Sequence, residues 1–174
     1  MLAECSSLTT APILPATTLA SGCYCYMFSG CTSLTTAPVL PATTLADSCY
    51  KSMFYRCTSL TTAPKLPATT LTPDCYWEMF GSCTSLTTAP NLPATTLVSN
   101  CYREMFDGCV KLASIDVSFT EWNKTEDATL SWMSAAGREA TGEKMFTCPE
   151  ELGDDATIRR GSSSCPNYWT VVNK

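Results

Sequence analysis

Residues 31–56 read CTSLTTAPVLPATTLADSCYKSMFYR, and this unit of 26 residues decides the fold. The same unit occupies residues 5–30, 57–82 and 83–108 without insertion, and 17 of its 26 positions are identical in all four copies. A fifth copy begins at Cys109 and then diverges. A period of about 20 to 50 residues is typical of stacked units, each too small to bury its own apolar face. The sequence therefore predicts an elongated array of coils.

The distribution of charge separates the repeats from the rest of the chain. Residues 1–108 contain 4 basic and 6 acidic residues, whereas residues 109–174 contain 7 basic and 10 acidic residues. The C-terminal part is therefore more polar, and it does not repeat. Because stacked repeats need a terminal unit that covers their last apolar layer, we divide the chain in two. Residues 1–109 are the repeat solenoid of four full copies, and residues 110–174 are a partial fifth repeat with a C-terminal cap.

Each unit contains the signals of one strand, one turn and one short helix. In the second copy, residues 33–37 combine a leucine with β-branched threonines, and the strand they predict must end near Pro38, since proline has no N–H to donate. Residues 47–48 (Asp-Ser) offer a helix N-cap. The apolar residues that follow recur at i, i+4 and i+8, as on one face of a short helix: Cys49, Met53 and Cys57. We therefore expect an α/β fold with right-handed crossovers between parallel strands.

Stacking places equivalent residues of successive copies on top of one another. Leucine, alanine, methionine, phenylalanine and cysteine then form continuous core ladders, and the threonines form hydroxyl ladders on a strand face. The helix positions that vary between copies, such as residues 51–52 and 55–56, are assigned to the solvent side. One strand position also varies between copies; it holds Ile13, Val39, Lys65 and Asn91.

The chain has 12 cysteines, whose spacing argues against a metal array or a redox relay. The C-x-C pair Cys23–Cys25 occurs only in the first copy, and the C-x-x-C spacing that zinc sites favour is absent. Cys49 and Cys57 lie eight residues apart on the predicted helix. Two turns of a helix span about 12 Å, which is too far for a disulfide between them. We interpret the repeat cysteines as small buried hydrophobic residues and expect six of them to be buried and reduced: Cys31, Cys49, Cys57, Cys75, Cys83 and Cys101. Cys148 and Cys165 form either one bridge in the cap or two free thiols.

Composition argues against several classes of function. With 11 basic against 16 acidic residues and a net charge of -5, the chain has too few basic residues to favour the basic face of a nucleic-acid-binding protein. The sequence has no histidine, which excludes histidine bases and histidine metal ligands. No apolar run approaches the roughly 20 residues that cross a bilayer, and residues 1–5 show no signal-peptide pattern. We expect no enzymatic activity, no catalytic residue, no cofactor and no metal ion.

The repeat motifs resemble the BspA-like leucine-rich repeats of bacterial surface proteins. The resemblance rests on C-T-S-L-T-T-A-P, L-P-A-T-T-L and C-Y-x-x-M-F-x-G-C within residues 5–117, and on Leu112-x-x-Ile115-x-Val117, which fits the family pattern L-x-x-I-x-I. It implies a right-handed leucine-rich-repeat solenoid with one short strand and one short helix per 26-residue coil, closed by a C-terminal cap. It also implies that Ala37 and the variable strand position, with their equivalents in the other copies, face inward. It also implies surface display, adhesion or receptor recognition, without identifying a ligand.

The C-terminal segment is similar to a closing segment that follows such repeats in proteins of gut-type anaerobic bacteria and their phages. The similarity rests on residues 131–133 (SWM), 140–142 (ATG), 145–146 (MF) and 166–172 (PNYWTVV). Cys165 departs from the pattern, in which an aliphatic residue usually precedes the proline. We expect three aromatic residues of this segment to cover the end of the stack: Trp132, Phe146 and Trp169.

Two interpretations of function follow from the repeat. The first is a non-enzymatic recognition or adhesion module of a surface-displayed protein, on a cell or a virion, that binds a protein or a glycan. The second is a structural segment of a phage tail fibre, or a filament subunit that associates end to end through its uncapped N-terminal repeat, because an uncapped coil exposes strand edges and an apolar layer. Neither interpretation involves nucleic acid or insertion into a membrane.

The residues that differ between copies are the candidates for ligand binding. Aromatic residues and arginine dominate many protein contacts, and stacking brings the variable helix positions of successive copies into one stripe. We therefore select six candidate binding residues: Lys51, Tyr55, Arg56, Trp77, Glu78 and Arg103. Neutral drift on a surface explains the same variation equally well. The threonine face is nearly uniform and would instead suit a periodic partner such as a fibre or a polysaccharide.

Overall fold

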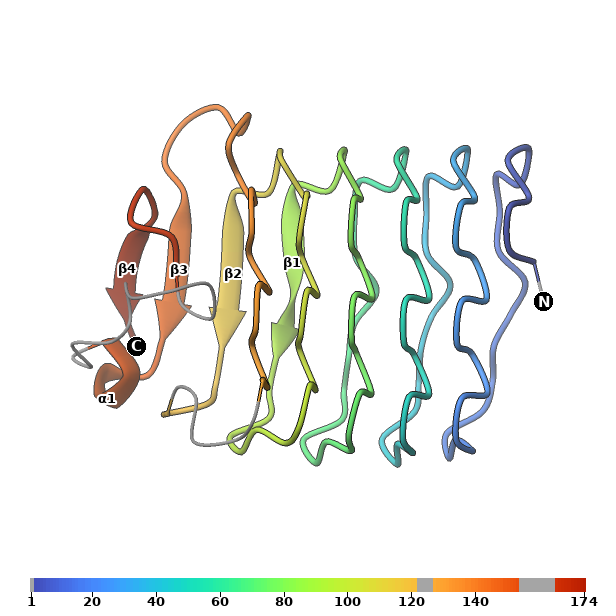
Figure 1. Cartoon of the computed structure of the whole chain (residues 1–174), viewed down its shortest axis with the longest axis horizontal. Coiled ribbons are helices and arrows are strands. Elements are labelled where there is room, and N and C mark those ends of the chain that lie inside the picture. Colours follow the sequence, from blue (N-terminus) through green and yellow to red (C-terminus); the bar gives the residue numbers. More distant parts are fainter. Residues whose placement is uncertain (1, 122–126, 154–164) are drawn as a thin grey trace.

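The computed structural model describes residues 2–121, 127–153 and 165–174. A series of coils lies side by side along the molecule, and the regular elements follow at its C-terminal end (Figure 1). These elements are β1 (Thr88–Leu92), β2 (Ser114–Val117), β3 (Met145–Cys148), α1 (Glu150–Gly153) and β4 (Thr170–Asn173). The strands form one parallel sheet in the order β1-β2-β3-β4. The described residues are thus built mainly around a parallel sheet, and the helix is a single turn.

The four copies of LTTAPxLPATTL form one side of the stack, which we call the strand wall; they are residues 8–19, 34–45, 60–71 and 86–97. Single parallel bridges link Thr10 to Thr36, Thr36 to Thr62 and Thr62 to Thr88. The parallel pairing that the sequence predicted for these segments is confirmed. It is limited to isolated residues because each segment contains two prolines, which have no N–H for a longer ladder.

The prediction of a short helix in each copy is wrong. Residues 48–56 instead form a ribbon of consecutive turns, in which every fourth residue has a positive φ: 56° at Ser48, 51° at Ser52 and 59° at Arg56. Within this ribbon, every second N–H donates to the carbonyl oxygen three residues earlier, as from Met53 to Tyr50 at 3.2 Å. An α-helix requires bonds to the fourth residue before. The same ribbon recurs over residues 22–30, 74–82, 100–108 and 127–135, and we call this side the turn wall.

The neighbouring coil explains why a ribbon of turns replaces the helix. The remaining N–H groups of the ribbon are directed along the stack and donate to the next coil, from Tyr50, Ser52 and Phe54 to the carbonyl oxygens of Cys75, Trp77 and Met79 at 2.8–3.1 Å. A helix would use these donors internally and would leave the coils unconnected on this side. Each left-handed residue costs about 1–2 kcal/mol, and the hydrogen bonds between coils, at about 0.5–1.5 kcal/mol each, offset that cost.

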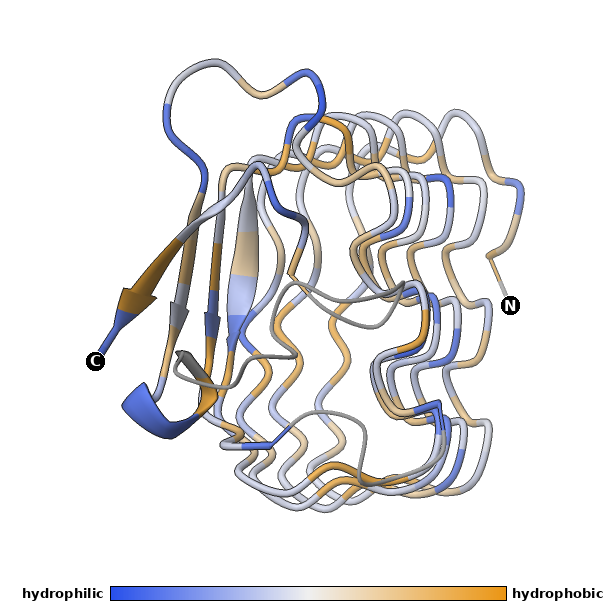
Figure 2. Ribbon diagram, turned by 60° about the vertical axis from the view of Figure 1, so that its left-hand side comes forward, coloured by the Kyte–Doolittle hydropathy of each residue, from blue (hydrophilic) through white to orange (hydrophobic). Residues whose placement is uncertain are grey.

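Equivalent side chains stack in ladders between the two walls. The rings of Phe28, Phe54, Phe80 and Phe106 lie 5.6–5.8 Å apart between centroids. The tyrosine ladder beside them is made of Tyr24, Tyr50, Tyr76 and Tyr102. The cysteines that open the second to fifth copies donate their thiol hydrogens to the preceding segment of the stack, as from Cys57 to the carbonyl oxygen of Phe28 at 3.1 Å. Hydrophobic segments therefore recur at the same place in successive coils (Figure 2).

Two assignments of side-chain direction are wrong. The variable strand position points outward, since 89% of Ile13 and 80% of Val39 are exposed. The inward side is occupied by the leucine that follows, such as Leu40. In the turn wall, Ser52 was assigned to solvent but is fully buried. The next coil covers Ser52: its backbone N–H donates to the carbonyl oxygen of Trp77, and its hydroxyl donates to the carboxylate of Glu78.

Aromatic side chains extend the core beyond the fourth copy. The ring of Trp132 lies 6.2 Å from that of Phe106 and 6.0 Å from that of Phe146, measured between centroids. Trp132, Phe146 and Trp169 are buried, as expected for residues that cover the end of the stack. Cys148 and Cys165 are both buried and are not joined by a disulfide, which decides between the two alternatives that the sequence left open.

The six cysteines expected to be buried are fully buried and free in the structure. Burial raises the pKa of Cys49 to about 11 and that of Cys57 to about 12. Because the thiolate is the reactive form, we expect iodoacetamide at pH 8 to leave these six unmodified in the native protein. Cys23, which is exposed, is the internal control and reacts quickly. Peptide mass spectrometry measures both rates, and comparable rates for Cys23 and Cys57 would contradict the buried ladder.

Glycine-to-alanine substitutions distinguish the ribbon of turns from a helix. In a helix, Gly108→Ala stabilises by about 1 kcal/mol. In the ribbon, where Gly108 has a φ of 70°, we expect a loss of about 1–2 kcal/mol. A Cβ at Gly108 would also lie 3.3 Å from the Ser82 hydroxyl oxygen, whereas Gly22, with a φ of 62°, has open space around it. Gly22→Ala therefore measures the cost of the left-handed backbone conformation without a steric contact. If urea unfolding showed either variant to be more stable than the unmodified chain, the ribbon would be refuted.

Candidate functional site

The six candidate binding residues lie on the turn wall, in three successive coils, and together form what we call the turn-wall stripe. The structure brings three of them into direct contact around one indole ring. The ammonium group of Lys51 lies 3.6 Å from the centroid of the Trp77 ring, and the guanidinium carbon of Arg103 lies 4.9 Å from it. The ring is half-buried. Stacking the coils therefore produces a cation–π cluster from residues that are 26 apart in the sequence.

Acidic residues hold this cluster in place. The indole N–H of Trp77 donates to Glu104 at 3.2 Å, and the guanidinium group of Arg103 forms ion pairs with Glu104 at 3.4 Å and with Asp127 at 3.2 Å. The Trp77 ring, its hydrogen-bond partner Glu104 and the guanidinium group of Arg103 thus have defined positions before any ligand binds. A surface of this kind loses little side-chain entropy on binding.

Glu78 lies beside the cluster and is partly withdrawn from water. The buried hydroxyl of Ser52 donates to its carboxylate at 2.9 Å. Burial raises the pKa of Glu78, the negative charges of Glu104 and Asp107 raise it further, and the hydroxyl of Ser52 opposes the shift. Burial likewise raises the pKa of Asp107. The cluster around Trp77 therefore combines two cations and an aromatic ring with neighbouring acidic residues, and burial raises the pKa of two of these, Glu78 and Asp107.

Tyr55 and Arg56 complete the stripe at its edge. A Cβ placed on Gly81 would lie 3.0 Å from the Tyr55 ring, so this ring packs closely over the glycine of the next coil. The guanidinium carbon of Arg56 lies 5.8 Å from the centroid of the same ring, and Arg56 is exposed. An aromatic residue in place of Gly81 would leave no room for Tyr55.

Sequence reasoning missed three residues that hold the stripe together: Ser52, Glu104 and Asp127. Glu78 and Glu104 occupy equivalent positions in successive copies, and that register could have signalled a shared acidic row. Ser52 could not be found, because its direction depends on the ribbon of turns rather than on a helix. Asp127 lies beyond the last full copy, where the repeat no longer predicts which residue faces Arg103.

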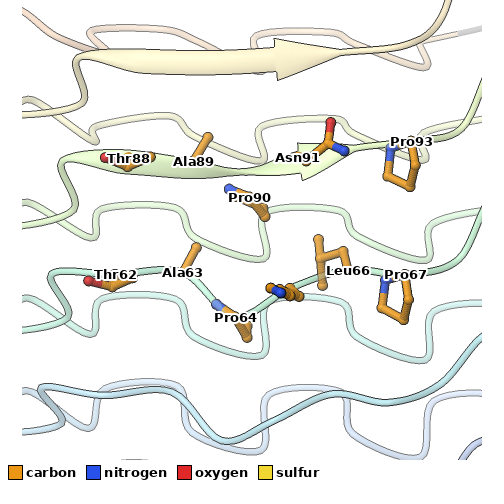
Figure 3. Close-up of a pocket in the computed structure, with 11 residues that line it drawn as sticks. Thr62, Ala63, Pro64, Leu66, Pro67, Thr88, Ala89, Pro90, Asn91 and Pro93 are labelled. Atoms are coloured by element: carbon orange, nitrogen blue, oxygen red, sulfur yellow. The ribbon is translucent and has the colours of Figure 1, made fainter.

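The strand wall carries two hollows between neighbouring coils. A cavity of about 560 Å³ lies between coils three and four and is walled by Pro64, Pro67, Pro90 and Pro93 (Figure 3). Lys65 and Asn91, the outward-pointing variable residues of these two coils, border it. A similar cavity of about 220 Å³ lies between coils one and two, beside Ile13 and Val39. The sequence did not single out either one, since it assigned all four residues to the core.

Two further searches bear on the site. Among the described residues, no group of three or more histidine, cysteine, aspartate or glutamate side chains is placed to hold a metal ion. In the same residues, no helix has the length and apolar character needed to span a membrane.

Comparison with known proteins returned no match. No family model fits the sequence, and no curated protein or solved structure is significantly similar to the chain. Any functional assignment therefore rests on the residues and the geometry described above.

Proposed function

We propose that this chain is a non-enzymatic recognition module of a surface-displayed protein, built as a right-handed solenoid of the BspA-like leucine-rich-repeat type. The repeat motifs, the parallel bridges between copies and the strong preference for right-handed crossovers support this assignment. In this proposal the predicted helix of each coil is replaced by a ribbon of turns, and residues 110–174 act as the C-terminal cap. The module is displayed on a cell or a virion.

The observation that carries the proposal is the cluster around Trp77. Three coils each contribute one side chain, and the contacts of 3.6 and 4.9 Å hold the aromatic ring between two cations. Tyrosine, tryptophan and arginine are enriched where protein interfaces gain most of their affinity. We therefore infer that the turn-wall stripe binds a protein partner on an opposing surface. A glycan is the other partner class for this stripe.

Alanine substitution at Trp77 tests the stripe. The probe is a printed array of extracellular proteins and glycans, and the labelled full chain is compared with Trp77→Ala. We expect Trp77→Ala to weaken binding to the ligands found by at least about 1 kcal/mol, because the ring is the centre of the cluster. Tyr26→Ala removes an exposed aromatic residue from the same wall and is the matched control. Thermal unfolding verifies that each variant is folded at the assay temperature.

The reciprocal variant lies on the opposite wall. Thr62→Arg places a large charge among the exposed threonines of the strand wall without touching the stripe. We expect it to leave unchanged the binding of those array ligands whose binding Trp77→Ala weakens. If Trp77→Ala binds normally and Thr62→Arg abolishes binding, the strand wall is the recognition surface and the stripe is not.

A structural role is the second candidate, and the outer face of coil one favours it. Cys23 is exposed and Tyr24 and Met27 are half-buried, whereas their counterparts in the next three coils are buried. These apolar side chains and the carbonyl groups beside them match what each coil presents to its neighbour inside the stack. We propose that this face supports end-to-end self-association, as in a tail fibre or a filament.

Light scattering across a concentration series tests self-association. If coil one docks onto another copy, the weight-average mass rises with protein concentration. Cys23→Glu should reduce that rise, because it places a charge on the docking face, and Lys111→Glu, at an exposed site outside the repeats, should not. A constant monomer mass up to the highest soluble concentration rules out the structural role.

A further inference from the structure

The strand wall varies at one position only, and that position faces solvent. Its four segments are identical in 11 of 12 residues, LTTAPxLPATTL, and x is Ile13, Val39, Lys65 or Asn91. All four of these side chains are exposed. Since a core position would constrain residue size and polarity, the change from isoleucine to lysine is tolerated because nothing packs on it. Variation on this wall is therefore confined to the surface that a ligand would meet.

Lys65 is the only charged residue in these four segments. Within the part of the chain that the structure describes, no carboxylate lies within ion-pairing distance of its ammonium group. The backbone N–H of Lys65 likewise donates to no described residue. Lys65 borders the 560 Å³ cavity, so a cation without a described ion-pair partner lies at the edge of a hollow on an otherwise uncharged wall. Such a cation favours an anionic ligand group.

The chemistry of the cavity limits what the rest of that ligand can be. Prolines line it together with Ala63, Leu66 and Ala89, so its surface is largely apolar. Exposed threonine hydroxyls such as those of Thr62 and Thr88 flank the cavity and recur once per coil along the wall. Alternating apolar and hydroxyl surface, repeated at a constant spacing, fits a polymer whose own units present C–H faces and hydroxyl groups.

We propose that the strand wall binds a linear acidic polysaccharide, with one uronic acid carboxylate paired to the ammonium group of Lys65 in the cavity between coils three and four. The neighbouring sugar units lie on the prolines and exchange hydrogen bonds with the threonine rows. This site is separate from the turn-wall stripe and does not depend on the function proposed for it. The net charge of -5 does not oppose it locally, because the other charges of the four repeats lie outside the strand wall.

Variants of the full chain test the site, with oligogalacturonate as the immobilised probe in a low-salt binding assay. We expect Lys65→Glu to weaken binding at least about tenfold and Lys65→Arg to retain it, because only the charge is required. Asn91→Lys places a second cation on the next coil and should tighten binding several-fold. Lys111→Glu makes the same charge change at an exposed site outside the wall and should have no effect. Since Lys65 is exposed, thermal unfolding should be unchanged in all four variants.

The outcomes separate this site from its competitors. Equal weakening by Lys111→Glu would reduce the effect to net charge, and equal or tighter binding of a poly-glutamate peptide would show the ligand to be a peptide; either result overturns the proposal. So does the absence of binding by the unmodified chain to oligogalacturonate, hyaluronate and alginate alike. Trp77→Ala should bind the probe normally, so a failure of the turn-wall stripe leaves this test intact.

Discussion

The backbone hydrogen bonds between successive ribbons of the turn wall are the interaction on which the rest of the structure depends. Every second N–H group of a ribbon donates to a carbonyl oxygen of the next coil, as from Phe54 to Met79 at 2.9 Å. The strand wall cannot take over this role, because its prolines interrupt pairing after single bridges such as Thr36 to Thr62. The ribbons thus set the spacing between coils, and that spacing lets the phenylalanine and tyrosine rings stack.

This constraint explains where the sequence is uniform and where it varies. A residue that faces the core meets its own counterpart above and below, so a change in one copy would disturb two interfaces. Phe54 and Cys57 are therefore repeated without change, and both are fully buried. Residues that face outward meet only solvent and one neighbour on each side. Apart from the residue after each opening cysteine, variation occurs at one position of the strand wall, in the turn wall and in the short segment that joins the two walls. Both proposed binding surfaces include such variable positions.

The two surfaces differ in how their charges are satisfied. Around Trp77, cations and acids from neighbouring coils pair with one another, so the stripe is rigid and preorganised. On the strand wall, Lys65 has no such partner among the residues that the structure describes, and it lies beside a cavity. A preorganised aromatic cluster suits a single protein partner, whereas a lone cation in a periodic wall suits one charged group of a repeating polymer. One stack of coils can present both without conflict, because the surfaces lie on opposite walls.

The sequence by itself determined the stacking of 26-residue units, the parallel pairing of the threonine segments and the burial of residues such as Cys57, because these follow from identical residues meeting at a fixed period. The tertiary structure alone decided that residues 48–56 form turns. A helix and a ribbon of turns both put Cys49, Met53 and Cys57 on one buried face, so this spacing does not distinguish them. Only the carbonyl groups of the next coil, which accept the hydrogen bonds, favour the ribbon. The direction of Lys65 was decided in the same way, since a strand side is inward or outward only once the coil has closed around its core.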